Sequence, residues 1–298
     1  MSGKTPASAG GSGKPVTDGH PADEVQYLEV KLILLPERMS SRKAFGEYAK
    51  LVRHAAKELD VAQFRELPPE YKVRDVLFYD TPTFDLYNHS FILRRRTYYV
   101  EGWPEGETEQ TLKFRHPELV HAAEVDVRPT VQVPYTIKFK EEMLPQRDEV
   151  GGKRSLYSHN LVTYSPDLMW PKTFAELTEL FPAVGHLGVS SKTRVSLVNA
   201  LAVEEVSTDV GELHFGHGLE AKANLALWRN RGTQEPMSAE FAFQCKFQRY
   251  DDLHQKSKKK AEHFFVYLQE LARDWVQTGV TKTALVYRAG GATLRNHE

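Results

Sequence analysis

Charged and apolar residues alternate along most of the segments that the sequence predicts as β-strands. Residues two apart lie on the same face of a strand. Glu29 and Lys31 therefore share one face of residues 28–34, and leucine, valine and isoleucine occupy the other. Six further charged faces carry Arg94 and Arg96; Thr111, Lys113 and Arg115; Glu124, Asp126 and Arg128; Lys138 and Lys140; Lys192 and Arg194; and Glu240, Gln244 and Lys246. The pattern predicts antiparallel strands that each carry one charged face.

Three segments show the apolar spacing of amphipathic helices. They cover about residues 41–60, 173–181 and 252–278. Ser41 can cap the first helix, Pro182 stops the second, and Gly279 ends the third. Each helix carries an apolar stripe that needs a surface to cover.

Two arrangements of the sheet satisfy this alternation. One is an ordinary sandwich, with its apolar faces in the core and its charged faces in water. The other is a barrel that is charged inside, apolar outside and covered by helices. The charged faces consist mainly of Arg, Lys and Glu, and the apolar helices need an apolar partner. Both facts favour the barrel, so we predict an α+β fold built on an antiparallel β-barrel tunnel clad by α-helices.

The chain is expected to form one domain behind a flexible tail. Residues 1–22 are rich in Gly, Ser, Pro and Thr and are predicted to be disordered. Residues 23–298 are expected to form the single tunnel domain. A stretch of mixed polarity around residues 143–167 is predicted to be a hairpin or loop inserted in the barrel.

Composition narrows the class of protein. The 39 basic and 40 acidic residues give a net charge of −1, so we expect no nucleic-acid partner. Cys245 is the single cysteine, which excludes an intramolecular disulfide and a Cys-rich zinc site. No segment approaches the roughly 18 apolar residues of a membrane span. We therefore expect a cytoplasmic protein without a membrane partner. The oligomeric state stays open, a homodimer included.

Seven short motifs resemble those of one family and follow one another in its order. They are Tyr27-Leu28-Glu29-Val30-Lys31; Tyr79-Asp80-Thr81-Pro82; Leu93-Arg94-Arg95-Arg96; Thr111-Leu112-Lys113; Glu124-Val125-Asp126; Lys192-Thr193-Arg194; and Glu240-Phe241-Ala242-Phe243. This set is similar to the CYTH superfamily, also called the triphosphate tunnel metalloenzymes. Lys282 resembles a late tunnel lysine of that family.

The resemblance implies a triphosphate site with a divalent metal, Mg²⁺ or Mn²⁺. It implies catalytic roles for Glu29 and Lys31. It implies that the anion is bound by Arg94, Arg96, Lys113, Arg115, Lys192, Arg194 and Lys246, and the metal by Glu29, Glu124, Asp126 and Glu240. Arg offers a planar fork to two oxygens, and hard cations prefer carboxylate oxygens. The implied activity is metal-dependent hydrolysis of inorganic triphosphate, a nucleoside triphosphate or thiamine triphosphate.

Two departures from the family pattern keep alternatives open. Tyr27 and Ala242 stand where the family has glutamates, so two of the implied metal ligands are missing. The basic half of the predicted site is therefore more complete than the acidic half. The alternatives are a polyphosphate- or nucleotide-binding module with weakened turnover and a class IV-type adenylate cyclase.

Overall fold

The computed structural model describes residues 16–17, 20–21, 24–62, 70–166, 168–247, 252–291 and 294. Apart from two short strands, the predicted N-terminal tail, residues 1–22, lies outside the described residues. Strands and helices follow each other through the remainder, which makes this an α+β fold.

The strands are β1 (Val16–Thr17), β2 (His20–Pro21), β3 (Tyr27–Leu34), β4 (Tyr71–Asp80), β5 (Phe91–Val100), β6 (Trp103–His116), β7 (Thr136–Leu144), β8 (Arg154–Thr163), β9 (Ser196–Leu197), β10 (Val203–His214), β11 (Glu220–Asn230) and β12 (Pro236–Lys246). The α-helices are α1 (Arg42–Glu58), α2 (Asp85–Asn88), α3 (Leu119–Glu124), α4 (Phe174–Leu180), α5 (Gln255–Leu271) and α6 (Lys282–Arg288). Short 3₁₀ turns cover Pro36–Met39, Pro182–Leu187, Val198–Ala200 and Arg273–Trp275.

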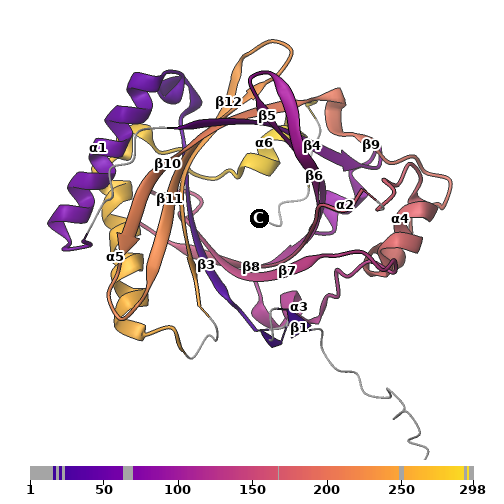
Figure 1. Cartoon of the computed structure of the whole chain (residues 1–298), viewed down its shortest axis with the longest axis horizontal. Coiled ribbons are helices and arrows are strands. Elements are labelled where there is room, and N and C mark those ends of the chain that lie inside the picture. Colours follow the sequence, from indigo (N-terminus) through magenta and orange to yellow (C-terminus); the bar gives the residue numbers. More distant parts are fainter. Residues whose placement is uncertain are drawn as a thin grey trace, which may run out of the picture.

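Nine strands form a closed barrel (Figure 1). Their order around the ring is β10-β11-β12-β3-β7-β8-β6-β5-β4, and β4 pairs with β10 to close it. Neighbours are antiparallel except β3 and β7, which run parallel. A closed ring has no free edge, so every barrel strand has a partner on both sides. The predicted barrel is confirmed, with this one parallel pair added.

The segment around residues 143–167 belongs largely to the barrel wall. β7 and β8 form an antiparallel hairpin in which Leu144 lies opposite Arg154. β8 also pairs with β6, so it occupies a full place in the ring. The connection between the two strands, residues 145–153, is the part of this stretch that extends beyond the ladder.

The apolar core lies outside the barrel, between the strands and the helices. Figure 1 shows α1 and α5 on one side of the ring and α4 on the opposite side. Phe45, Tyr48 and Val52 of α1 and Phe264, Phe265 and Leu268 of α5 pack with Leu28, Leu225 and Phe241 of the wall. Phe174 and Leu177 of α4 pack with Leu93, Leu112 and Leu161. The outward faces of the strands are therefore buried by helices, as the barrel hypothesis requires.

Local capping places two of these helices where the sequence predicts them. The Ser41 hydroxyl accepts a hydrogen bond of 3.1 Å from the backbone N–H of Ala44. Thr173 and Glu176 form a reciprocal capping box at the start of α4. Such caps satisfy N–H groups that have no partner within the helix. Among the described helices, none is both long enough and apolar enough to span a bilayer.

Helix α6 packs into one end of the barrel. Its Ala284, Val286 and Tyr287 form a cluster with inward-facing apolar side chains, namely Val76, Phe78, Ile92, Val203 and Trp228. The Tyr287 ring stacks on Tyr87 at 4.3 Å, and its hydroxyl donates to Asp80 at 3.2 Å. Asp80 also accepts from the backbone N–H groups of Leu86 and Tyr87. The Tyr79-Asp80-Thr81-Pro82 motif therefore ties α2 and α6 to this end.

Two predicted strands are wrong. Glu124 is the last residue of α3, and Asp126 follows it in a segment that belongs to no named strand. Pro129 cannot donate to a ladder, and Asp126 instead accepts a hydrogen bond from the backbone N–H of Arg128. Lys192 lies in a turn, and Arg194 makes a single isolated bridge to Thr173. A charged face of two or three residues was too short a signal in both places.

We predict that the stability of this fold depends on its outer apolar layer. Leu225→Ala should destabilise the protein by about 2–5 kcal/mol, because the side chain is fully buried under the helices and its loss leaves a cavity. Leu119→Ala is the matched control, since Leu119 is 43% exposed, and it should change stability by less than about 0.5 kcal/mol. Urea unfolding measures both. Equal losses would contradict the assignment of the core to the outside of the barrel.

Candidate functional site

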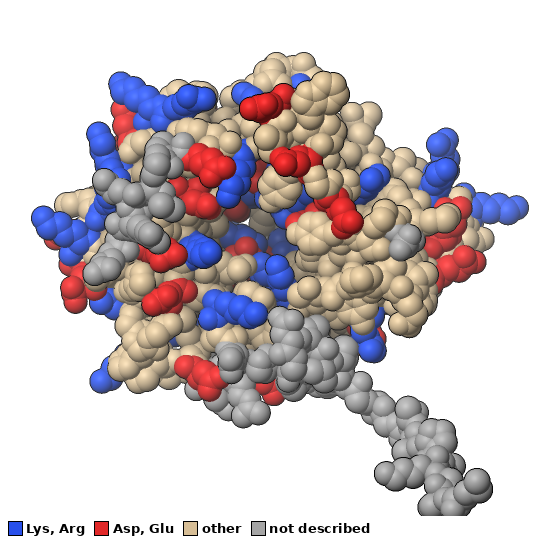
Figure 2. Space-filling model, viewed as in Figure 1, with Lys and Arg blue, Asp and Glu red and all other residues tan. Residues whose placement is uncertain are grey.

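A cavity of about 310 Å³ lies inside the barrel. In the described part of the chain, nine cationic residues line it: Lys31, Arg74, Arg94, Arg96, Lys113, Arg115, Lys140, Lys222 and Lys282. Three acidic residues line it as well: Glu29, Glu205 and Glu240. Figure 2 shows Lys and Arg side chains around a central hollow in this face of the molecule. The cavity wall therefore carries a clear excess of positive charge.

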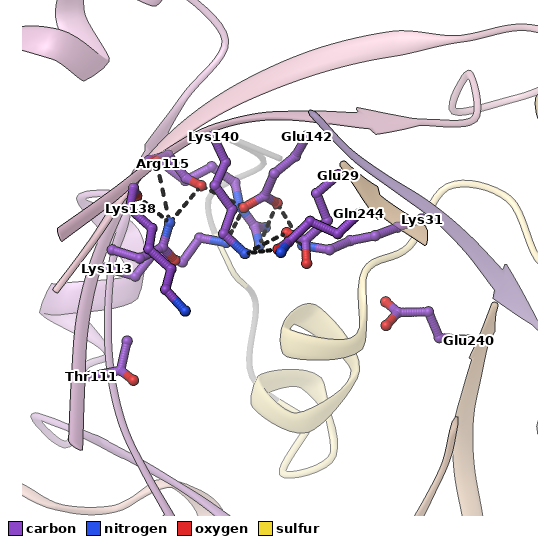
Figure 3. A network of polar contacts seen from close by, with 12 residues as sticks. Glu29, Lys31, Thr111, Lys113, Arg115, Lys138, Lys140, Glu142, Glu240 and Gln244 are labelled. Atoms are coloured by element: carbon purple, nitrogen blue, oxygen red, sulfur yellow. Dashed lines mark hydrogen bonds and ion pairs between the residues drawn. The ribbon is translucent and has the colours of Figure 1, made fainter. Parts of the chain in front are cut away.

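Glu142 lies at the centre of the densest charge cluster (Figure 3). Its side chain is 0% exposed. Lys113 contacts one of its oxygens directly, and Lys31 and Arg115 lie 3.0 and 3.3 Å from the other. The Ser158 hydroxyl donates a further bond of 2.5 Å. One carboxylate of β7 thus holds three cations that project from two other strands, β3 and β6.

Glu29 extends this cluster into the cavity. It lies 2.9 Å from Lys31 and 3.3 Å from Lys140. Lys140 also donates to the side-chain oxygen of Gln244 at 2.7 Å. Glu29 and Glu142 occupy directly paired positions of the parallel strands β3 and β7. The shared lysine Lys31 lies between their carboxylates and reduces their repulsion.

The pKa values in this cluster are set by burial and by the contacts of two acids with four cations. The acids are Glu29 and Glu142, and the cations are Lys31, Lys113, Arg115 and Lys140. Burial opposes the charge of Glu142, but Arg115, Lys113 and Lys31 outweigh it and hold its pKa well below the usual value. Burial also opposes the charge of Lys31, but Glu142 and Glu29 outweigh it and raise its pKa. Burial and the neighbouring Arg115 lower the pKa of Lys113 far below its usual value. Glu142 is thus firmly ionised and Lys31 is well paired, whereas Lys113 lacks enough negative partners.

A second cluster lies beside α6. Glu205 is buried and is bound by Arg74 at 2.6 Å and by the Trp228 indole N–H at 2.5 Å. Lys282 lies 2.8 Å from Glu240 and 3.8 Å from Glu205, and its ammonium sits 4.5 Å from the centre of the Trp228 ring. Figure 3 shows Glu240 well apart from the group around Glu142. Glu205 and Glu240, which share Lys282, are therefore separate from the cluster around Glu142.

A third pairing lies on β5 and β6. Glu109 is 3.1 Å from Arg96 and 3.4 Å from Arg94, so one carboxylate serves two guanidinium groups. Burial raises the pKa of Glu109, but Arg96 and Arg94 outweigh it and lower it to about 2. Among the described residues, the buried Nε–H groups of Arg74, Arg94 and Arg96 have no hydrogen-bond acceptor. Unsatisfied buried donors are costly, which again indicates that this wall lacks negative charge.

Seven of the predicted site residues line the cavity. They are Glu29, Lys31, Arg94, Arg96, Lys113, Arg115 and Glu240. They come from β3, β5, β6 and β12, which the closed ring brings around one space. Lys282, the loosely matched late lysine, lines it too. Their location is as predicted, and their roles in binding or catalysis remain predictions.

Five predicted site residues lie elsewhere. Lys192 and Arg194 are exposed in the connection before β9, outside the barrel. Glu124 and Asp126 are exposed near α3, where Asp126 forms an ion pair of 2.5 Å with Arg128. Lys246 is exposed at the end of β12, and its ammonium sits 5.9 Å from the centre of the Tyr27 ring. None of the five is among the residues that line the cavity.

Several charged residues of the interior were missed from the sequence. Glu142 follows Lys138 and Lys140 at the spacing of a strand, so a longer reading of that alternation would have found it. Glu205 is the second of two consecutive glutamates, which hides the face it occupies. Arg74 precedes the apolar part of β4, and Glu109 lies before the predicted start of its charged face.

The donor set does not fit a divalent cation held by the protein. Within the described residues, no three Asp, Glu, His or Cys side chains form a group that could bind a metal ion. Of the four predicted ligands, only Glu29 and Glu240 line the cavity, and lysines already contact both. Tyr27 and Ala242 provide no carboxylate at the neighbouring inward positions.

Comparison with known proteins gives likenesses among solved structures. No family model and no curated protein matches the sequence. A candidate adenylyl cyclase from Hippeastrum, described as having a dominant triphosphatase activity, is 16% identical with a TM-score of 0.44, covering 92% of this chain and all of that one. A candidate adenylate cyclase from Bacillus halodurans is 12% identical with a TM-score of 0.39, covering 87% and 95%.

An RNA triphosphatase from S. pombe, solved in complex with the Spt5 CTD, is 9% identical with a TM-score of 0.24, covering 76% of this chain and 65% of that one. The class of this chain is defined by its own strand pairing and lining residues: a closed, helix-clad barrel with a cationic interior cavity.

We predict that the ionised Glu142 carboxylate stabilises the folded protein and that this stabilisation is lost at acidic pH. Its folded pKa lies below the ordinary value of 4.5, so its contribution is complete above about pH 5 and is lost as the pH falls through the folded value. Glu142→Gln should cost about 3–5 kcal/mol at pH 7, because three buried cations lose their partner. It should also flatten the loss of stability between pH 6 and pH 3.

Urea unfolding at a series of pH values measures this effect. Glu124→Gln is the matched control, because Glu124 is exposed on the surface, and it should keep the pH dependence of the wild type. If Glu142→Gln keeps the wild-type dependence as well, the carboxylate is not the acid on which this stability depends.

Proposed function

We propose that this chain binds a triphosphate-type anion inside its barrel. The observation that carries the proposal is the excess of cations over acids around one enclosed cavity. Buried cations without enough negative partners raise the free energy of the empty site. An anion that enters supplies the missing charge, and phosphate oxygens match the donor geometry of Arg and Lys.

The arrangement favours a chain of phosphates over a single one. The cations belong to separate groups: Arg94 and Arg96 on β5, Lys113 and Arg115 on β6, and Lys282 at the start of α6. A single phosphate can reach few of these groups at once. Linked phosphates extend from one group to the next and carry several negative charges, so they can satisfy more of the wall.

We predict that Arg94→Ala weakens the binding of inorganic triphosphate by about 1.5–3 kcal/mol, the scale of a hydrogen bond to a charged group. This corresponds to a roughly 10- to 150-fold larger Kd. The reason is that Arg94 lines the cavity and shares its acidic partner, Glu109, with Arg96. Isothermal titration calorimetry measures the change.

Arg194→Ala is the matched control. Arg194 belongs to a motif that resembles the family's tunnel strand, but it is exposed outside the barrel, so its removal should leave the Kd unchanged within about twofold. A loss of affinity that is equal for both variants would mean that the anion binds to the outer surface.

Hydrolysis of the bound triphosphate is a second candidate function. The observation that favours it is that Glu29 and Glu240 line the same cavity as the cations. Mg²⁺ usually keeps several waters and binds one or two carboxylates together with substrate phosphates. A metal that enters as its triphosphate complex would have to share Glu29 or Glu240 with their lysine partners, and the arginines would stabilise the charge that develops on the phosphates.

A hydrolysis panel tests this second candidate. Phosphate release is measured with Mg²⁺ or Mn²⁺ from inorganic triphosphate, nucleoside triphosphates and thiamine triphosphate. If the protein hydrolyses its ligand, phosphate is released, and the variants Lys113→Met and Glu29→Gln should release less of it. Chromatography of the products from ATP separates hydrolysis from cyclic AMP formation. Release no higher than the blank from folded protein would leave binding as the function.

A further inference from the structure

Each acidic residue that lines the cavity, within the described chain, already has a cationic partner from the protein. Glu29 lies 2.9 Å from Lys31 and 3.3 Å from Lys140. Glu240 lies 2.8 Å from Lys282. Glu205 lies 2.6 Å from Arg74. A metal site needs carboxylates whose negative charge is not already neutralised by the protein. Here a lysine or an arginine neutralises each of these carboxylates.

Two inward positions beside these acids, Tyr27 and Ala242, carry no charge. Tyr27 precedes Glu29 by two residues on the same face of β3, and the ammonium of Lys140 sits 5.7 Å from the centre of its ring. Ala242 precedes Gln244 on the inward face of β12 and pairs with Lys31 across the ladder. No second carboxylate therefore stands next to Glu29 or Glu240 on β3 or β12. Glu142, which pairs with Glu29 from β7, is already contacted by Lys31, Lys113 and Arg115.

Lys282 is fixed at the place where a cation would be needed. Its ammonium contacts Glu240 and lies 4.5 Å from the centre of the Trp228 ring, so two attractive contacts hold it. α6, which carries it, is anchored by the buried Tyr287. A divalent ion at Glu240 would have to displace this lysine or lie beside it, and like charges repel strongly in a partly buried site.

We propose that the barrel binds its triphosphate-type ligand free of divalent metal, with Lys31, Lys140 and Lys282 neutralising the charge that Mg²⁺ would otherwise neutralise. This inference rests on the proposed function and specifies the form of the ligand. The uncomplexed anion carries more negative charge than its magnesium complex, so it satisfies more of the cationic wall.

Calorimetry with sodium triphosphate tests this inference directly. The titration is done in excess EDTA and then in excess Mg²⁺, at constant ionic strength because screening alters charged binding. The Kd should be at least threefold smaller in EDTA. A Kd that is equal or larger in EDTA would overturn metal-free recognition and leave triphosphate binding intact. The absence of binding under both conditions would overturn the proposed function itself.

Metal binding to the free protein provides an independent readout. Electron paramagnetic resonance should detect no Mn²⁺ bound in the wild-type cavity. The double variant Tyr27→Glu/Ala242→Glu should gain Mn²⁺ binding, because it places carboxylates beside Glu29 and Glu240. Tyr27→Gln/Ala242→Gln is the matched control and should gain none. The inference would be overturned if the wild type bound Mn²⁺ and if Glu240→Gln or Glu29→Gln abolished that binding.

Discussion

The fold depends on placing charge inside a closed ring of strands without leaving it unpaired. Buried charges are tolerated only when partners satisfy them, and here Glu142, Glu109 and Glu205 each hold two or more cations. These acids fix the side chains of neighbouring strands in one arrangement. The charges around the cavity do not balance, because cationic residues outnumber acidic ones there. The same arrangement therefore specifies the interior of the barrel and prepares it for an anion.

An interior of this kind requires the apolar core to lie elsewhere. The outward faces of the strands supply it, and α1, α4 and α5 cover them. Alternation along each strand thus serves two purposes at once, since one face binds helices and the other surrounds the cavity. A slip of one residue in register would exchange the two faces and lose both. This constraint explains why long alternating segments such as β3 and β12 pair in unbroken register from Tyr27 to Leu34.

The sequence was sufficient for the barrel, its covering helices and seven of the residues that line the cavity. Long alternation in β3, β6 and β12 and a clear cap at Ser41 made these predictions reliable. It was not sufficient where the signal was short. The short charged faces at Glu124–Arg128 and Lys192–Arg194 lie outside the barrel because helix, turn and proline preferences decide those segments. Glu142 and Glu205 were missed because their importance depends on cations from other strands, which no local pattern reveals.

The position of α6 has a consequence for how a ligand is exchanged. Among the described residues, Ala284, Val286 and Tyr287 of α6 pack with apolar side chains of the wall at one end of the barrel, which makes that end unfavourable for a charged ligand. A linear ligand would then enter more readily through the other end of the barrel, with its first phosphate leading, and leave by the same route. Its leading phosphate would meet Lys282, and any remaining units or an attached organic group would trail toward solvent. The distance from that end of the barrel to α6 thus limits the number of phosphate units that the protein can enclose.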